Sequence, residues 1–156
     1  MLASSKVEIQ SKNLDEIAMF AAKEAAKRHR RTVVVEDSGL FVKALNGFPG
    51  PFSSYVHATI GHEGLLRLMK RVSRREAYFQ ASLAVVSPNC ASQHFSDRVY
   101  GSVSRKAAGT DGFGFDPIFV PKGVDKTFAE GGADFKDQYS HRAKAFRKLA
   151  LWLKGA

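Results

Sequence analysis

Residues 32–39 read Thr-Val-Val-Val-Glu-Asp-Ser-Gly, a β-branched run that passes directly into two adjacent carboxylates. An unbroken β-branched run predicts a strand buried on both faces, which we place at residues 32–35. The polar residues 36–39 predict that this strand ends there, in a flexible turn. Ligands of α/β folds bind just beyond the carboxyl ends of strands, so Asp37 and Ser38 are candidate site residues.

The two carboxylates also suggest a metal. Adjacent carboxylates repel each other unless a cation neutralises them, and Mg²⁺ prefers hard oxygen ligands of this kind. The alternative interpretation is an ordinary acidic turn, and residues 36–39 alone do not separate the two.

Helical and strand patterns are mixed on both sides of this stretch. Asn13 is a good N-cap for a helix that begins at Leu14 and closes in the basic run 27–31. Alternating apolar residues predict a strand at 78–85, with weaker strands at 95–103 and 118–120 and further helices at 63–72 and from Ser140 to just before Gly155. The apolar stripes expected to be buried are Leu14, Ile17, Phe20, Ala21 and Ala25 in the first helix, and Ala143, Phe146, Leu149, Ala150 and Leu153 in the last. We therefore predict one α/β domain with a mixed sheet flanked by helices, residues 1–156.

Composition narrows the class of protein. The length of 156 residues and a hydrophobic content of 44% suit a single globular domain. Cys90 is the only cysteine, which excludes an internal disulfide and fits the reducing cytoplasm. No apolar run has the length of a bilayer span, and we expect no membrane association. The net charge of +9 favours a polyanionic partner such as nucleic acid or a nucleoside triphosphate, the alternative being a solvated basic surface.

A second candidate motif is Gly112-Phe113-Gly114-Phe115-Asp116-Pro117. Glycine lets the backbone approach a ligand closely, and the phenylalanines offer faces on which a purine can stack. Asp116 could accept hydrogen bonds from a sugar or a base. A turn carrying two core phenylalanines is the alternative.

A third candidate motif is Ser140-His141-Arg142 at the start of the last predicted helix. Unpaired N–H groups, a hydroxyl and a guanidinium at a helix N-terminus suit a phosphate or a carbonyl group. Lys136 lies close enough along the chain to reach the same place. The alternative is a capped helix with solvated cations, and a solvated side chain is also the local interpretation of Glu8.

Taken together, these segments resemble the inosine triphosphate pyrophosphatase family, also called dITP/XTP pyrophosphatases. The resemblance runs in order through almost the whole chain, and it looks closest to archaeal members. The matching pieces are residues 7–10, 35–42, 45–50, 59–61, 77–79, 112–119, 126–130 and 140–145.

This resemblance implies an elongated, twisted mixed sheet of the anticodon-binding-like (Maf-like) architecture and a homodimer that binds no specific nucleic acid. It implies Mg²⁺-dependent hydrolysis of ITP, dITP or XTP to the monophosphate and pyrophosphate. Asp37 matches the general base and metal ligand, and Glu8 matches a second acidic position near the metal. The positions that match substrate contacts are Ser38, Phe113, Gly114, Phe115, Asp116, Lys136, His141 and Arg142.

One segment of the family pattern has no match here. Family members begin with a strand, a Thr/Ser-x-Asn-x-x-Lys turn that grips the triphosphate, and a long helix, and we expect this first strand and helix to be missing. Two other functions therefore stay open beside the pyrophosphatase. One is a catalytically weakened or inactive nucleotide-binding relative, and the other is a phosphatase or pyrophosphatase with another nucleotide preference.

Overall fold

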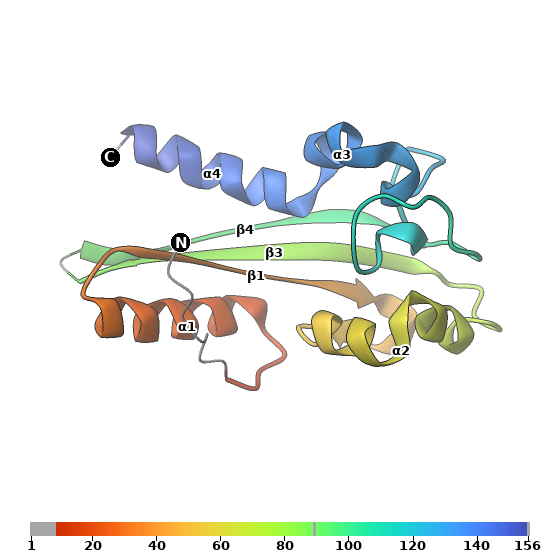
Figure 1. Ribbon diagram of the computed structural model, residues 1–156, viewed down its shortest axis with the longest axis horizontal. Helices are drawn as coiled ribbons and strands as arrows, with labels where there is room; N and C mark the ends of the chain where they lie inside the picture. The colour runs from red at the N-terminus through yellow and green to blue at the C-terminus, as the bar shows by residue number, and fades with distance from the viewer. Residues whose placement is uncertain (1–8, 89, 156) are drawn as a thin grey trace.

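The computed structural model describes residues 9–88 and 90–155, which form one sheet with helices on both sides (Figure 1). In Figure 1, α3 and α4 lie on one side of the long strands, whereas α1 and α2 lie on the other. Within the described ranges, none of the helices combines the length and the apolar character that a membrane crossing requires. The helices are α1 Leu14–His29, α2 Ser53–Leu68, α3 Phe128–Tyr139 and α4 His141–Gly155, with 3-10 turns at Lys43–Leu45 and Asp116–Ile118. The strands are β1 Val33–Val42, β2 Pro49–Gly50, β3 Glu76–Ser87, β4 Cys90–Val103 and β5 Phe119–Pro121.

The α/β class is confirmed, and the sheet has five strands in the order β2-β1-β3-β4-β5. Each strand pairing among the described residues is antiparallel, so the mixed sheet expected from the sequence is not seen in this part of the chain. The long strands β3 and β4 pair along almost their whole length and form the central part of the sheet.

Strand β1 extends beyond its predicted end. Residues 36–42 continue the strand, and Asp37 pairs with Ser82 of β3, so the predicted turn at 36–39 is wrong. The strand is also not buried on both faces, because α4 covers β3 and β4 and leaves Val34 of β1 48% exposed. The polar residues 36–38 therefore lie within β1 and do not end it.

The helices pack on the sheet through narrow stripes. The Asn13 cap of α1 is confirmed, since its side chain accepts a hydrogen bond from the Asp15 amide. Small residues let α1 lie close to the sheet, and its buried positions are Leu14, Ile17, Ala18, Ala21, Ala22 and Ala26, with Phe20 and Ala25 only half-buried. Helix α4 buries His141, Ala145 and Leu149.

The expected burial of other residues of α4 is wrong. Phe146, Ala150 and Leu153 are exposed and Ala143 is half-buried, because only the stripe through Ala145 and Leu149 meets the inward residues of β3. The helix also continues through Gly155 instead of ending before it.

Two further helices differ from the sequence prediction. Helix α2 begins at Ser53, earlier than expected, and contains a break at Gly61, whose φ is 65°. Helix α3 was not predicted, because Gly131 and Gly132 interrupt its pattern. It is started by a capping box, in which Thr127 and Glu130 each bond the other's backbone amide. Helix α3 carries Lys136 toward the site described next.

Candidate active site

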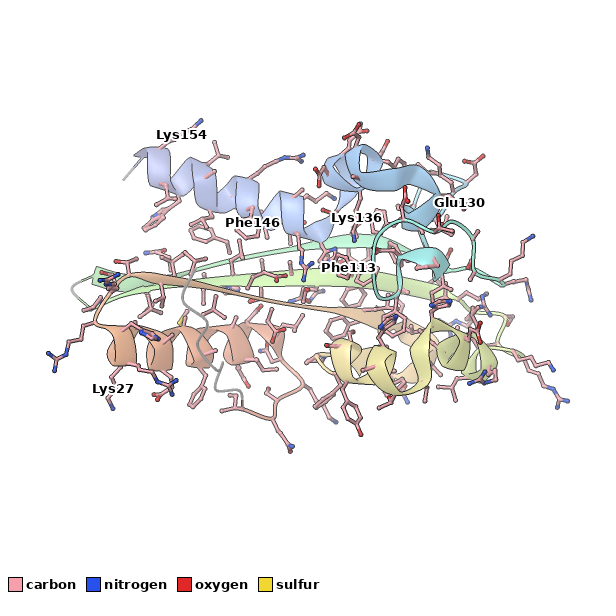
Figure 2. All side chains as sticks on the ribbon, viewed as in Figure 1. Lys27, Phe113, Glu130, Lys136, Phe146 and Lys154 are labelled. Atoms are coloured by element: carbon pink, nitrogen blue, oxygen red, sulfur yellow. The ribbon has the colours of Figure 1, made fainter. Side chains whose placement is uncertain are left out.

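All eight predicted substrate residues line one cavity of about 300 Å³. It lies between β1 and α2 on one side and the 113–116 turn, α3 and α4 on the other. Figure 2 shows Phe113 beside Lys136 in the space between the sheet and α3. The cavity is lined by Ser38, Gly39, Ser53, Ser54, His57, Phe79, Phe113, Gly114, Phe115, Asp116, Lys136, His141 and Arg142.

The 112–116 turn is built around Asp116, whose side chain is buried. One carboxylate oxygen, Oδ2, accepts a hydrogen bond from the Phe113 amide at 2.8 Å and one from Lys136 Nζ at 2.5 Å. Gly112 has a φ of 80°, and a Cβ there would lie 2.3 Å from the same oxygen. Asp116 therefore shapes the turn and fixes Lys136, in addition to the ligand contact predicted for it.

Phe113 presents its ring to solvent with two cations beside it. The side chain is 60% exposed, which is unusual for phenylalanine. Lys136 Nζ lies 3.9 Å from the ring centroid, and Arg142 Cζ lies 5.1 Å from it. These cation–π contacts hold both positive groups at the place where a planar, electron-rich ligand could stack on the ring.

His141 is buried, being only 5% exposed, and stacks on Phe79 with the ring centroids 4.9 Å apart. Burial, followed by the charges of Arg142 and Lys136, lowers the pKa of His141 to about 3. The imidazole is therefore neutral near pH 7, with one N–H donor and one acceptor. Its Nδ1 is buried without a hydrogen-bond partner among the described residues. Such a group is uncommon in folded proteins and points to a partner supplied by a ligand or by water.

Arg142 lies in the first turn of α4 and reaches β1. Its Nε donates to Glu36 Oε1 at 2.9 Å, and its Nη2 donates to Ser38 Oγ at 3.1 Å. The long strand and the last helix are thereby joined at the cavity.

The opposite wall comes from α2, and the sequence analysis did not identify it. Ser53 donates to the Gly50 carbonyl at 2.7 Å and accepts from the Leu40 amide at 2.8 Å, so α2 is pinned to β1. Beside this contact the Gly50 backbone of β2 approaches β1 so closely that Gly39 is required, because a Cβ there would lie 2.1 Å from the Gly50 oxygen. His57 contacts Phe115 edge-on, with the centroids 5.6 Å apart. The contact of His57 with Phe115 joins residues far apart in the sequence, and no local pattern predicts it.

Asp37 does not line the cavity. Successive side chains of a strand point to opposite faces, so Asp37 faces away from its neighbours Glu36 and Ser38. Its Oδ1 accepts a hydrogen bond from the Ser38 amide at 2.9 Å. Among the described residues β2 pairs only with Leu40 and Phe41 of β1, so the edge of β1 at Asp37 carries no described neighbouring strand.

The residues predicted to hold Mg²⁺ are described only in part. Glu8 lies outside the described residues. Within residues 9–88 and 90–155, no three His, Cys, Asp or Glu side chains gather as a metal site. Mg²⁺ commonly keeps several waters and is held by one or two carboxylates together with substrate phosphates. Asp37 is half-buried, and its carboxylate is a hard-oxygen group of the kind that such a site uses.

Known proteins match both the sequence and the fold. A sequence model of the Ham1 family matches residues 2–152. The dITP/XTP pyrophosphatase of Ignicoccus hospitalis is 50% identical over 155 residues, which cover 99% of this chain and 82% of that protein. That of Hyperthermus butylicus is 47% identical over 97% of this chain and 80% of its own length. The solved structure of the Staphylococcus aureus Ham1 protein has a TM-score of 0.91 and 33% identity, over 98% of this chain and 82% of that one.

Proposed function

Since the chain belongs to the Ham1 family, we propose that it hydrolyses ITP, dITP and XTP to the nucleoside monophosphate and pyrophosphate. The observation that carries this proposal is the buried Nδ1 of His141, which has no hydrogen-bond partner among the described residues and lies beside Arg142 and Lys136 in a cavity that also offers the exposed Phe113 ring. These groups match the chemistry of a 6-oxopurine, and two similar proteins carry the name dITP/XTP pyrophosphatase.

The polarity of the cavity selects the base. Hypoxanthine and xanthine present a carbonyl oxygen at position 6 beside an N–H at position 1. The donors of Arg142 and Lys136 suit that oxygen, and neutral His141 can donate to the base or accept from it. Adenine presents an amino group at position 6 and would leave buried donors unpaired, which costs about 1–3 kcal/mol for each unpaired group.

Phe113 holds the plane of the base. Stacking of a base on an aromatic ring contributes about 1–3 kcal/mol, and the exposed ring is available for this contact. Lys136 and Arg142 already lie near the ring, so the purine would enter beside them and exchange part of their cation–π contact for hydrogen bonds.

The triphosphate of the bound nucleotide would extend out of the cavity past Ser38 and across the edge of β1 to Asp37. Asp37 would accept the proton of the attacking water, and with Glu8 it would hold Mg²⁺. Bound Mg²⁺ would supply charge neutralisation of the phosphate oxygens. Cationic side chains of the chain would also neutralise the phosphate charge. Phosphoryl-type transfer is accelerated mainly by positioning and charge stabilisation.

We also propose that the protein works as a homodimer in the cytoplasm. Exposed aromatic side chains gather around β2 and the start of α2, namely Phe48, Phe52 and Tyr55. Grouped exposed apolar residues are typical of protein interfaces. Light scattering coupled to size-exclusion chromatography should give twice the 17.1 kDa chain mass, and a monomer at micromolar concentration would oppose this proposal.

The assignment of Asp37 is tested by Asp37→Asn, which keeps the shape of the side chain and removes its basicity. We expect ITP turnover to fall at least about 100-fold, the size of a typical general-base contribution. Binding of IMP, measured by calorimetry, should stay within about twofold, because Asp37 does not line the base cavity. Full turnover in this variant would remove Asp37 from the mechanism.

A further inference from the structure

Among the described residues that contact Arg142, Glu36 is the one without a role assigned above. It is not among the residues that line the cavity, yet its carboxylate holds Arg142 Nε at 2.9 Å. We propose that Glu36 is a positioning residue for base recognition, which fixes the Arg142 guanidinium in the plane that a 6-oxopurine requires. This inference rests on the proposed function and adds a specificity-determining residue to it.

Two side chains of β1 bind the Arg142 guanidinium. Glu36 and Ser38 are two residues apart on the strand, so their side chains leave the same face. Together they accept hydrogen bonds from Nε and Nη2 of one guanidinium, and these two bonds orient its plane. One N–H of Nε and one of Nη2 are thereby used. Three of the five N–H donors remain for a ligand and for water.

Arg142 needs this support because of its position. A cation in the first turn of a helix faces the positive end of the helix dipole, which is unfavourable. Free arginine side chains also carry about 2 kcal/mol of rotamer entropy, which binding would otherwise have to remove. An anionic partner that orients the side chain before the ligand arrives reduces both costs, and this is the effect of preorganisation on affinity.

Two other roles for Glu36 fit the structure less well. A metal ligand for the phosphates would belong on the face of Asp37, whereas Glu36 lies on the opposite face of β1. An uncompensated carboxylate near a polyanionic substrate would repel it. Its pairing with Arg142 removes that repulsion, and so accounts for an acidic residue beside an anion-binding cavity.

A purely structural strand–helix clamp is the remaining alternative, and the chain contains a matched control for it. Asp97 of β4 pairs with Lys148 of α4 at 2.9 Å, which also joins a strand to α4. The Asp97 side chain is 25% exposed and that of Glu36 is 22% exposed. Neither Asp97 nor Lys148 lines the cavity.

The test compares Glu36→Gln with Asp97→Asn. We expect Glu36→Gln to raise the IMP dissociation constant and the KM for ITP about 10-fold, with kcat changed less than about threefold. Selectivity for ITP over ATP, taken as the ratio of their kcat/KM values, should fall. Asp97→Asn should alter none of these quantities. Equal IMP affinity and equal ITP KM in the two variants would overturn the proposal and leave only a structural clamp.

A double-mutant cycle with Arg142→Lys separates positioning from a direct effect of the carboxylate. Lysine keeps the charge and loses the planar fork. In that background Glu36→Gln should cause no further loss of IMP affinity, and an additional 10-fold loss would contradict the proposal. Should Glu36→Gln fail to fold, Glu36→Asp replaces it, with an expected IMP affinity between those of the wild type and Arg142→Lys.

Failure of the proposed function gives a different result from failure of this inference. A wild-type chain that binds IMP but does not convert ITP refutes the pyrophosphatase, and the IMP affinities of the variants still decide the role of Glu36. A wild-type chain that neither converts ITP nor binds IMP overturns both.

Discussion

Replacing His141 by phenylalanine should make the fold less sensitive to acid. The pKa of His141 in the folded protein is lowered to about 3, first by burial and then by Arg142 and Lys136. The unfolded chain takes up this proton near the ordinary histidine pKa of about 6.5. Between these two values the unfolded state binds one more proton than the folded state. Stability contributed by neutral His141 is therefore present above pH 6.5 and is lost as pH falls toward 3.

The magnitude follows from the gap between the two pKa values. One proton corresponds to a slope of about 1.4 kcal/mol per pH unit, so the whole gap corresponds to as much as about 5 kcal/mol. The free energy of unfolding of small domains is about 5–15 kcal/mol, and acid should therefore weaken this fold substantially. A phenylalanine ring keeps the stack on Phe79 and cannot take up a proton.

Urea denaturation at a series of pH values from 7.5 to 4.5 measures this difference. The slope of unfolding free energy against pH should be smaller in His141→Phe than in the wild type, by up to about 1.4 kcal/mol per unit. His57→Phe is the control, since it removes an imidazole from an exposed position on the same cavity and reports the effect of losing a histidine as such. Parallel curves for the wild type and His141→Phe would show that His141 does not take up the additional proton on unfolding.

Two further predictions concern the frame of the cavity. Gly39→Ala should lower the free energy of unfolding by about 2–4 kcal/mol, because the new Cβ would lie 2.1 Å from the Gly50 backbone oxygen. Gly114→Ala should lower it by only about 1–2 kcal/mol, because a Cβ there meets no atom within 4 Å and only the positive φ is unfavourable. Equal urea midpoints for these two variants would contradict the close approach of the Gly50 backbone in β2 to Gly39 in β1. Thr127→Ala should cost about 1–2 kcal/mol through loss of the capping box of α3, and an unchanged urea midpoint would show that the cap contributes nothing.

The sequence predicted the side chains that line the cavity better than the helix and strand contacts that hold them in place. The 113–116 turn was identified as one motif and the pair His141-Arg142, with Lys136 in reach of it, as another, and the structure brings them into one cavity. Each carries a local signal, such as a glycine beside an aromatic or a cation at a helix start. The wall formed by Ser53, Ser54 and His57 has no such signal, because its position depends on the contact of α2 with β1.

The errors share a physical cause, which is tertiary packing that local patterns do not contain. The polar residues Glu36 and Asp37 predicted the end of a strand. Strand β1 nevertheless continues, because its backbone N–H and C=O groups form hydrogen bonds with β3. Phe146 and Leu153 suggested a buried stripe, but α4 meets the sheet along only one line through Ala145 and Leu149. Gly131 and Gly132 concealed α3, whose start is secured by the Thr127–Glu130 capping box.

We expect the cavity to bind the base of a 6-oxopurine nucleotide while water attacks phosphorus and breaks the anhydride bond between the first and second phosphates. Incubation of the purified chain with ITP and Mg²⁺, followed by ion-exchange separation of the nucleotides and a pyrophosphate assay, tests it most directly. IMP and pyrophosphate should appear in equal amounts, and ATP should be converted far more slowly. Release of IDP and inorganic phosphate, or equal rates with ITP and ATP, would contradict it.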